Sequence, residues 1–87
     1  MEEQQLFGTL KPFEQRLIEE YRDLDAKTKK LEKFIDTDNP IYYSLELAEQ
    51  TDLVTQLHAM IIYRLALSNR LSRKGLLEKF FPLAEQG

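Results

Sequence analysis

The sequence predicts an all-α fold, an antiparallel hairpin of two long helices that continues into a short helical tail at its C-terminal end. Three observations lead to this prediction. A stretch of breaker residues, Asp-Thr-Asp-Asn-Pro, occupies positions 36–40 near the middle of the chain. Apolar residues recur at helical spacing in the half that follows it. In the half that precedes it, seam residues are spaced four and three apart, as in a heptad repeat: Leu17, Tyr21, Leu24, Thr28, Leu31 and Ile35.

The elements follow from these signals in chain order. Pro12 suits the first turn of a helix, where its missing N–H costs nothing. Ser44 is a candidate cap for the second helix, and Gly75 marks its stop or a kink. We find no linker or repeat and expect one domain. Its predicted segments are a leader at 1–11, a helix at 12–35, an elbow at 36–45, a second helix at 46–74 and an apolar tail at 75–87.

The second helix is more apolar than one neighbouring helix can cover. Further apolar residues widen its main apolar stripe, which consists of Leu53, Leu57, Met60, Leu67 and Leu71. An 87-residue chain without cysteine has no disulfides to stabilise it. We therefore expect a homo-oligomer, and the tail either folds back on its own hairpin or docks on a neighbouring subunit. The residues that widen the stripe are Val54, Ile61 and Leu65.

Composition narrows the function classes. A single histidine and no cysteine exclude multi-histidine and thiolate metal sites, and no nucleophile or paired-acid arrangement indicates an enzyme. We expect no catalytic residues, no metal and no cofactor. The net charge of −3 argues against general nucleic-acid binding. No apolar run approaches the ~20 residues of a membrane span and the N-terminus is not that of a signal peptide. The absence of cysteine fits a reducing cytoplasm.

Arg64 is the first candidate binding residue, because it lies in the middle of the apolar stripe of the second helix. In one interpretation its guanidinium stacks on Tyr21 or pairs with Glu14 while its stem covers apolar surface. In the other, copies of Arg64 from several subunits face a shared pocket and bind an anion, since arginine suits phosphate recognition.

Two further groups combine cations with aromatic residues. Around the elbow, lysines lie beside tyrosines that could stack on a base, although the same lysines could simply form surface ion pairs near a helix end. At the end of the second helix, cations precede two phenylalanines that either dock a partner or complete the core. The predicted ligand-binding residues are Arg64, Tyr21, Lys27, Lys30, Lys33, Tyr42 and Tyr43, and the predicted partner-binding residues are Arg70, Arg73, Lys74, Phe80 and Phe81.

Several short motifs resemble a family of small phage-encoded helical proteins found in crAss-like and other tailed phages. The resemblance covers about residues 13–71, and the chain departs from the family pattern before the second helix and in its aromatic tail. It rests on Gln15-Arg-Leu-Ile-Glu-Glu20, Leu24-Asp25, Lys30-Leu31, Lys33-Phe-Ile35, Glu49-Gln50, Leu53, Gln56-Leu57, Ala59-Met60, Tyr63, Leu67 and Arg70-Leu71.

The resemblance implies a phage protein that acts in the cytoplasm of a bacterial host. Many proteins of this kind neutralise host defence, some of them as helical sponges for cyclic nucleotide signals. Our hypothesis is therefore a non-enzymatic counter-defence protein that sequesters a cyclic nucleotide in pockets of a homo-oligomer. The alternative is an inhibitor that binds a host defence enzyme through the second helix and the C-terminal tail.

Overall fold

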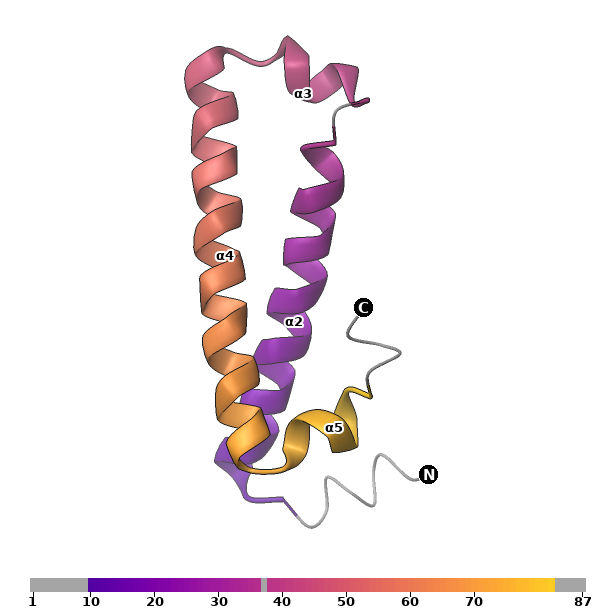
Figure 1. Cartoon of the computed structure of the whole chain (residues 1–87), viewed down its shortest axis with the longest axis vertical. Helices are drawn as coiled ribbons and strands as arrows, with labels where there is room; N and C mark the ends of the chain where they lie inside the picture. Colours follow the sequence, from indigo (N-terminus) through magenta and orange to yellow (C-terminus); the bar gives the residue numbers. More distant parts are fainter. Residues whose placement is uncertain (1–9, 37, 83–87) are drawn as a thin grey trace.

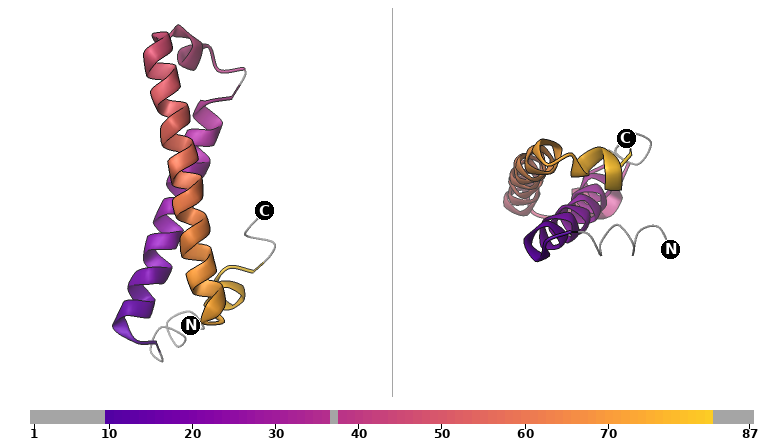
Figure 2. Two further views of the ribbon diagram at one scale, coloured as in Figure 1. Left: turned by 60° about the vertical axis from the view of Figure 1, so that its left-hand side comes forward. Right: turned by 90° about the horizontal axis from the view of Figure 1, so that it is seen from below.

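The computed structural model describes residues 10–36 and 38–82, and it confirms the predicted all-α hairpin. Helices α2 (Pro12–Phe34) and α4 (Leu47–Arg73) run antiparallel along the length of the molecule. A short helix, α3 (Pro40–Ser44), connects their ends, and α5 (Leu76–Phe80) follows α4 (Figures 1 and 2). The result is a rod of 48 × 21 × 18 Å.

The heptad seam predicted for the first helix forms the α2 side of the core. Its Leu17, Tyr21, Leu24 and Thr28 are buried, as is the neighbouring Ile18. Thr28 is a polar residue at a fully buried position, and its hydroxyl donates a hydrogen bond of 2.7 Å to the carbonyl oxygen of Leu24. This bond within the helix satisfies the hydroxyl, so that the threonine can lie in the seam.

The elbow contains a helix that the sequence analysis did not predict. Asn39 precedes α3, and its side chain accepts a hydrogen bond from the Ile41 N–H at 3.0 Å while its amide donates to the Phe34 carbonyl at 2.6 Å. Pro40 then occupies the first turn of α3. The prediction that Ser44 caps the second helix is wrong. Ser44 is the last residue of α3 and donates to the carbonyl of Ile41 at 2.7 Å.

The tail folds back on its own hairpin, which decides between the two arrangements expected for it. Gly75 has φ 69°, in the left-handed region that favours glycine, and lets the chain turn sharply after α4. Beyond it, Leu76, Phe80 and Phe81 join the hydrophobic core. The ring of Phe81 meets the ring of Tyr21 on α2, with centroids 4.7 Å apart and planes at 65°. The last five residues of the predicted tail, 83–87, and the first nine of the predicted leader lie outside the described residues.

We predict that Phe81→Ala lowers the free energy of unfolding by about 3–5 kcal/mol, because it removes a large ring from the core. Phe81 is only 8% exposed. Denaturant unfolding followed by circular dichroism measures the loss. Tyr63→Ala is the matched control, because Tyr63 is 47% exposed and should change stability by no more than about 0.5 kcal/mol. Equal effects of the two substitutions would contradict the packing of the tail.

Candidate functional site

Arg64 is ion-paired in the middle of the hairpin. Its guanidinium lies 3.1 Å from the carboxylate of Asp25 and 3.8 Å from that of Glu32, both on α2. Asp25 also pairs with Lys29 at 3.0 Å, as expected for a lysine one turn further along the helix. The prediction that Glu14 would be the acid partner is wrong, since Glu14 instead accepts a hydrogen bond from the backbone of Lys11.

Arg64 pairs with Asp25 and not with Glu14 because the two long helices pair in a different register from the expected one. A chain reversal centred near position 40 would place Arg64 opposite Leu17 and Tyr21. The two helices do not end level at the elbow: α4 begins beyond the end of α2, and α3 bridges the offset (Figure 1). Arg64 therefore falls opposite Asp25. The cation therefore has fixed acid partners in the single chain.

Tyr21 lies in the core. It is 7% exposed, and its ring packs against Phe81. Burial raises the pKa of the Tyr21 hydroxyl above its ordinary value of 10.0, and the nearby carboxylate of Asp25 raises it further, while Arg64 and Lys29 partly oppose the shift. Its face is covered by its own chain and cannot stack on a base in this arrangement.

The elbow residues predicted to bind a ligand lie apart from Arg64. Tyr42 is 6% exposed and packs edge-on against Phe34 and Tyr43, with ring centroids 6.2 and 5.0 Å away. Tyr43 is more than half exposed. The remaining three predicted residues are solvent-exposed on α2: Lys27, Lys30 and Lys33.

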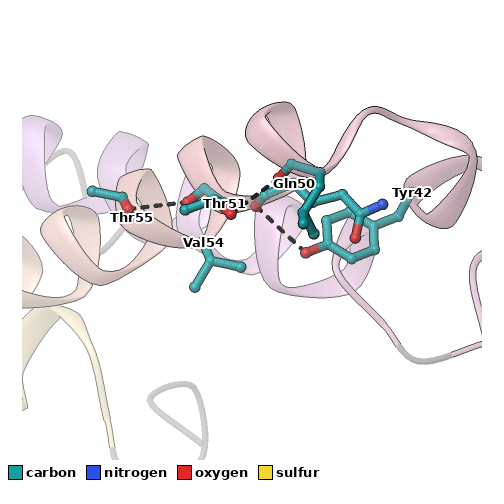
Figure 3. Close-up of a pocket in the computed structure, with 6 residues that line it drawn as sticks. Tyr42, Gln50, Thr51, Val54 and Thr55 are labelled. Carbon is teal, nitrogen blue, oxygen red and sulfur yellow. Dashed lines mark hydrogen bonds between the residues drawn. The ribbon is translucent and has the colours of Figure 1, made fainter.

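Tyr42 lines a hollow of about 240 Å³ at the start of α4 (Figure 3). Its hydroxyl donates to the carbonyl of Gln50 at 3.4 Å. The hydroxyls of Thr51 and Thr55 donate to carbonyls one turn back along α4, those of Leu47 and Thr51, at 3.0 Å. The hollow has no charged residue in its lining, which consists of Tyr42, Leu47, Gln50, Thr51, Val54 and Thr55.

A second hollow, of about 360 Å³, is built by the open end of the hairpin. Antiparallel pairing brings the first turn of α2 beside the last turn of α4, at the lower end of the molecule in Figure 1. There Phe13 lines the hollow together with Arg70, Arg73 and Lys74. The ammonium of Lys74 lies 4.8 Å from the centroid of the Phe13 ring. We call this set the basic hollow.

The cations of the basic hollow are not neutralised within the part of the chain that the structure describes. No carboxylate of residues 10–36 or 38–82 forms an ion pair with Arg70, Arg73 or Lys74. Phe13 is 43% exposed, so part of its ring surface is open to solvent. Three cations beside an accessible aromatic ring suit an anionic ligand that carries a planar ring.

The structure divides the predicted partner-binding group. Arg70, Arg73 and Lys74 come together in the basic hollow, whereas Phe80 and Phe81 are buried in the core. Sequence analysis missed Phe13. Phe13 lies outside the predicted seam. The signal that could have identified it is its position: it is an aromatic residue in the first turn of one helix, and antiparallel pairing places that turn beside the cationic last turn of the other helix.

None of the described helices is long and apolar enough to cross a membrane. Over the same residues, no group of three or more histidine, cysteine, aspartate or glutamate side chains is arranged to hold a metal ion.

Comparison with known proteins gives one family. The family model described as Sequestin matches residues 11–73. The chain belongs to the Sequestin family. The match spans α2, α3 and α4 and ends with the last residue of α4. It therefore includes the whole hairpin and all of the basic hollow except Lys74, while α5 lies beyond it. No curated protein and no solved structure matches the chain. The name Sequestin indicates a family that sequesters, which is a binding role and not a catalytic one.

We predict that the Tyr21 shift makes the fold more sensitive to alkali. Because the folded pKa is raised above 10.0, the unfolded chain loses its phenolic proton first. The stabilising contribution is fully present below pH 10 and is lost as the pH rises through the folded pKa. Tyr21→Phe should therefore flatten the fall in unfolding free energy above pH 10, measured by denaturant titration. Tyr63→Phe, at an exposed position, should keep the pH dependence of the unfolding free energy seen in the parent protein. If the parent and both variants show the same slope above pH 10, the raised pKa of Tyr21 is contradicted.

We also predict an asymmetry between the two partners of the central ion pair. Arg64→Leu should change the free energy of unfolding by less than about 1 kcal/mol, because leucine extends the apolar stripe and Asp25 keeps Lys29. Asp25→Leu should cost about 1–3 kcal/mol, because it leaves a largely buried guanidinium with only its longer contact to Glu32. Thermal or denaturant unfolding measures both changes. A large loss for Arg64→Leu would show that the ion pair itself holds the helices together.

Proposed function

We propose that this Sequestin-family chain is a phage counter-defence protein that sequesters a cyclic nucleotide immune signal, in pockets of a homo-oligomer in the cytoplasm of the bacterial host. The observation that supports it most is the basic hollow, where three cations that have no acid partner among residues 10–36 and 38–82 gather beside an accessible aromatic ring. The sequestering role indicated by the family name is consistent with a site that binds and does not react.

The chemistry of the basic hollow fits a phosphate ester. Guanidinium groups bind phosphate oxygens through paired N–H donors, and Arg70 and Arg73 supply two such groups on adjacent turns of α4. Lys74 adds a flexible third cation, and the Phe13 ring offers a surface on which a base can stack. The local excess of positive charge explains how a chain of net charge −3 can attract an anion.

The size of the hollow explains why an oligomer belongs in the proposal. A volume of about 360 Å³ lies at the lower end of the range of small-molecule sites. It accommodates part of a cyclic dinucleotide or trinucleotide, so a second copy of the chain would have to cover the rest. A site closed by two copies would also exclude solvent, which strengthens ion pairing with phosphate.

The structure gives little support to the alternative of a protein-binding inhibitor. Phe80 and Phe81, the aromatic residues of the tail on which it relied, pack in the chain's own core. The exposed surface of α4 remains available to that alternative.

We predict that Arg73→Ala weakens binding of the cyclic nucleotide at least ~10-fold, the factor that corresponds to 1.4 kcal/mol and to the lower part of the range for charge-assisted hydrogen bonds. Isothermal titration calorimetry against a panel of cyclic dinucleotides and trinucleotides measures the loss, which should shrink as salt is added. Lys30→Ala removes an exposed cation on α2 and is the matched control.

The same titrations compare the two candidate sites. If Arg64→Leu and Lys30→Ala abolish binding while Arg73→Ala leaves it unchanged, the ligand is held by the middle and elbow of the hairpin, as the sequence first indicated. If no member of the panel binds the parent protein at low salt, the proposed function is wrong.

A further inference from the structure

One side of α4 is exposed, largely apolar and free of charge. Ile62 and Leu65 are 69% and 58% exposed, and Leu47 is 78% exposed. At about 100° per residue these positions fall on one side of the helix, and between Leu47 and Asn69 that side has no acidic, lysine or arginine residue. We call this surface the uncharged stripe, and its members are Leu47, Thr51, Val54, Thr55, His58, Ile61, Ile62 and Leu65.

The uncharged stripe has a hollow at one end and a protrusion at the other. The hollow is the 240 Å³ depression lined by Thr51, Val54 and Thr55 at the beginning of α4 (Figure 3). The protrusion consists of Ile62 and Leu65. At a rise of 1.5 Å per residue, the hollow and the protrusion each lie roughly 8 Å from His58 along the helix axis, on opposite sides of it.

We propose that two copies of this chain pair through the uncharged stripe, with their α4 helices antiparallel and crossing at His58. A two-fold axis through this point places Ile62 of each copy opposite Val54 of the other and Leu65 opposite Thr51. Each protrusion then enters the other copy's hollow, so that the same contact is made twice, as an isologous interface requires.

The charges at the ends of α4 favour a second copy in this orientation. The first turns carry Glu46, Glu49 and Asp52 and no cation, whereas the last turn carries Arg70 and Arg73 and no acid. Antiparallel pairing brings the acidic end of one helix near the basic end of the other, and parallel pairing would bring like charges together. Charge complementarity therefore selects the antiparallel arrangement.

This pairing leaves the basic hollow open to a ligand. Arg70 and Lys74 project from α4 about 120° and 160° round the helix from His58, away from the centre of the stripe. Arg73 projects about 60° from it, roughly two turns beyond Leu65. The pairing is a property of α4 and does not depend on which ligand the basic hollow binds.

The absence of cysteine from the sequence makes a cross-linking test specific. In the full chain, His58→Cys should give a disulfide-linked dimer under mild oxidation, because the two copies meet at this position. Gln56→Cys is the matched control, since position 56 lies on the opposite side of α4, and it should remain monomeric on a non-reducing gel. Val54→Cys and Ile62→Cys should cross-link efficiently when mixed and poorly when alone.

Charge substitution tests both the surface and its orientation. Ile62→Lys should raise the dimer dissociation constant at least ~10-fold in sedimentation velocity. Ile62→Lys combined with Val54→Glu should recover dimerisation, because antiparallel pairing places each new lysine opposite a new glutamate of the other copy. Circular dichroism confirms that each variant is folded.

Failure of this proposal can be separated from failure of the proposed function. A parent protein that is monomeric at every concentration, or one that self-associates without cross-linking through position 58, would overturn the pairing. If the double variant does not recover dimerisation, the antiparallel orientation is wrong. Phe13→Ala removes the ring of the basic hollow without touching α4 and should still dimerise, so a loss of nucleotide binding in that variant reports on the ligand site alone.

Discussion

The register between α2 and α4 is the constraint on which the other features of this protein depend. It sets which seam residues meet in the core, and it places Asp25 beside Arg64. It also brings the first turn of one helix beside the last turn of the other, where Phe13 and the cations of α4 meet. A shift of one turn would move every one of these contacts. The elbow fixes this register, because Asn39 ties the end of α2 to the start of α3 through two side-chain hydrogen bonds.

Periodicity was enough to predict the helices, because burial of a repeating apolar face is a local property of the sequence. The seam from Leu17 to Thr28 is buried as expected, and the observed bounds of both long helices lie within a residue of the predicted ones. The elbow could not be predicted in the same way. Five residues, Pro40–Ser44, are too few to show a helical period, and their helix is specified by the capping contacts of Asn39 and the fixed geometry of proline.

The errors at the candidate site follow from that one omission. Without α3 the two long helices are expected to end level at the elbow, which places Arg64 opposite the wrong turn of α2 and assigns it the wrong acid; α4 in fact starts beyond the end of α2. Phe13 was missed for a related reason, because its importance comes from residues almost 60 positions away. The cations of α4 were recognised from their types, whereas the roles of Phe80 and Phe81 depended on a tertiary contact with Tyr21 that no local pattern encodes.

The basic hollow joins the two open ends of the hairpin, and this has a consequence for how the molecule holds together. Helix ends fray more readily than helix centres, because their backbone groups lack partners within the helix. A ligand that contacted Phe13 and Arg73 at once would act as a clasp between the first turn of α2 and the last turn of α4. Capture of the signal and closure of the hairpin's free end would then be a single event, and the occupied protein would be more rigid and more resistant to proteolysis than the empty one.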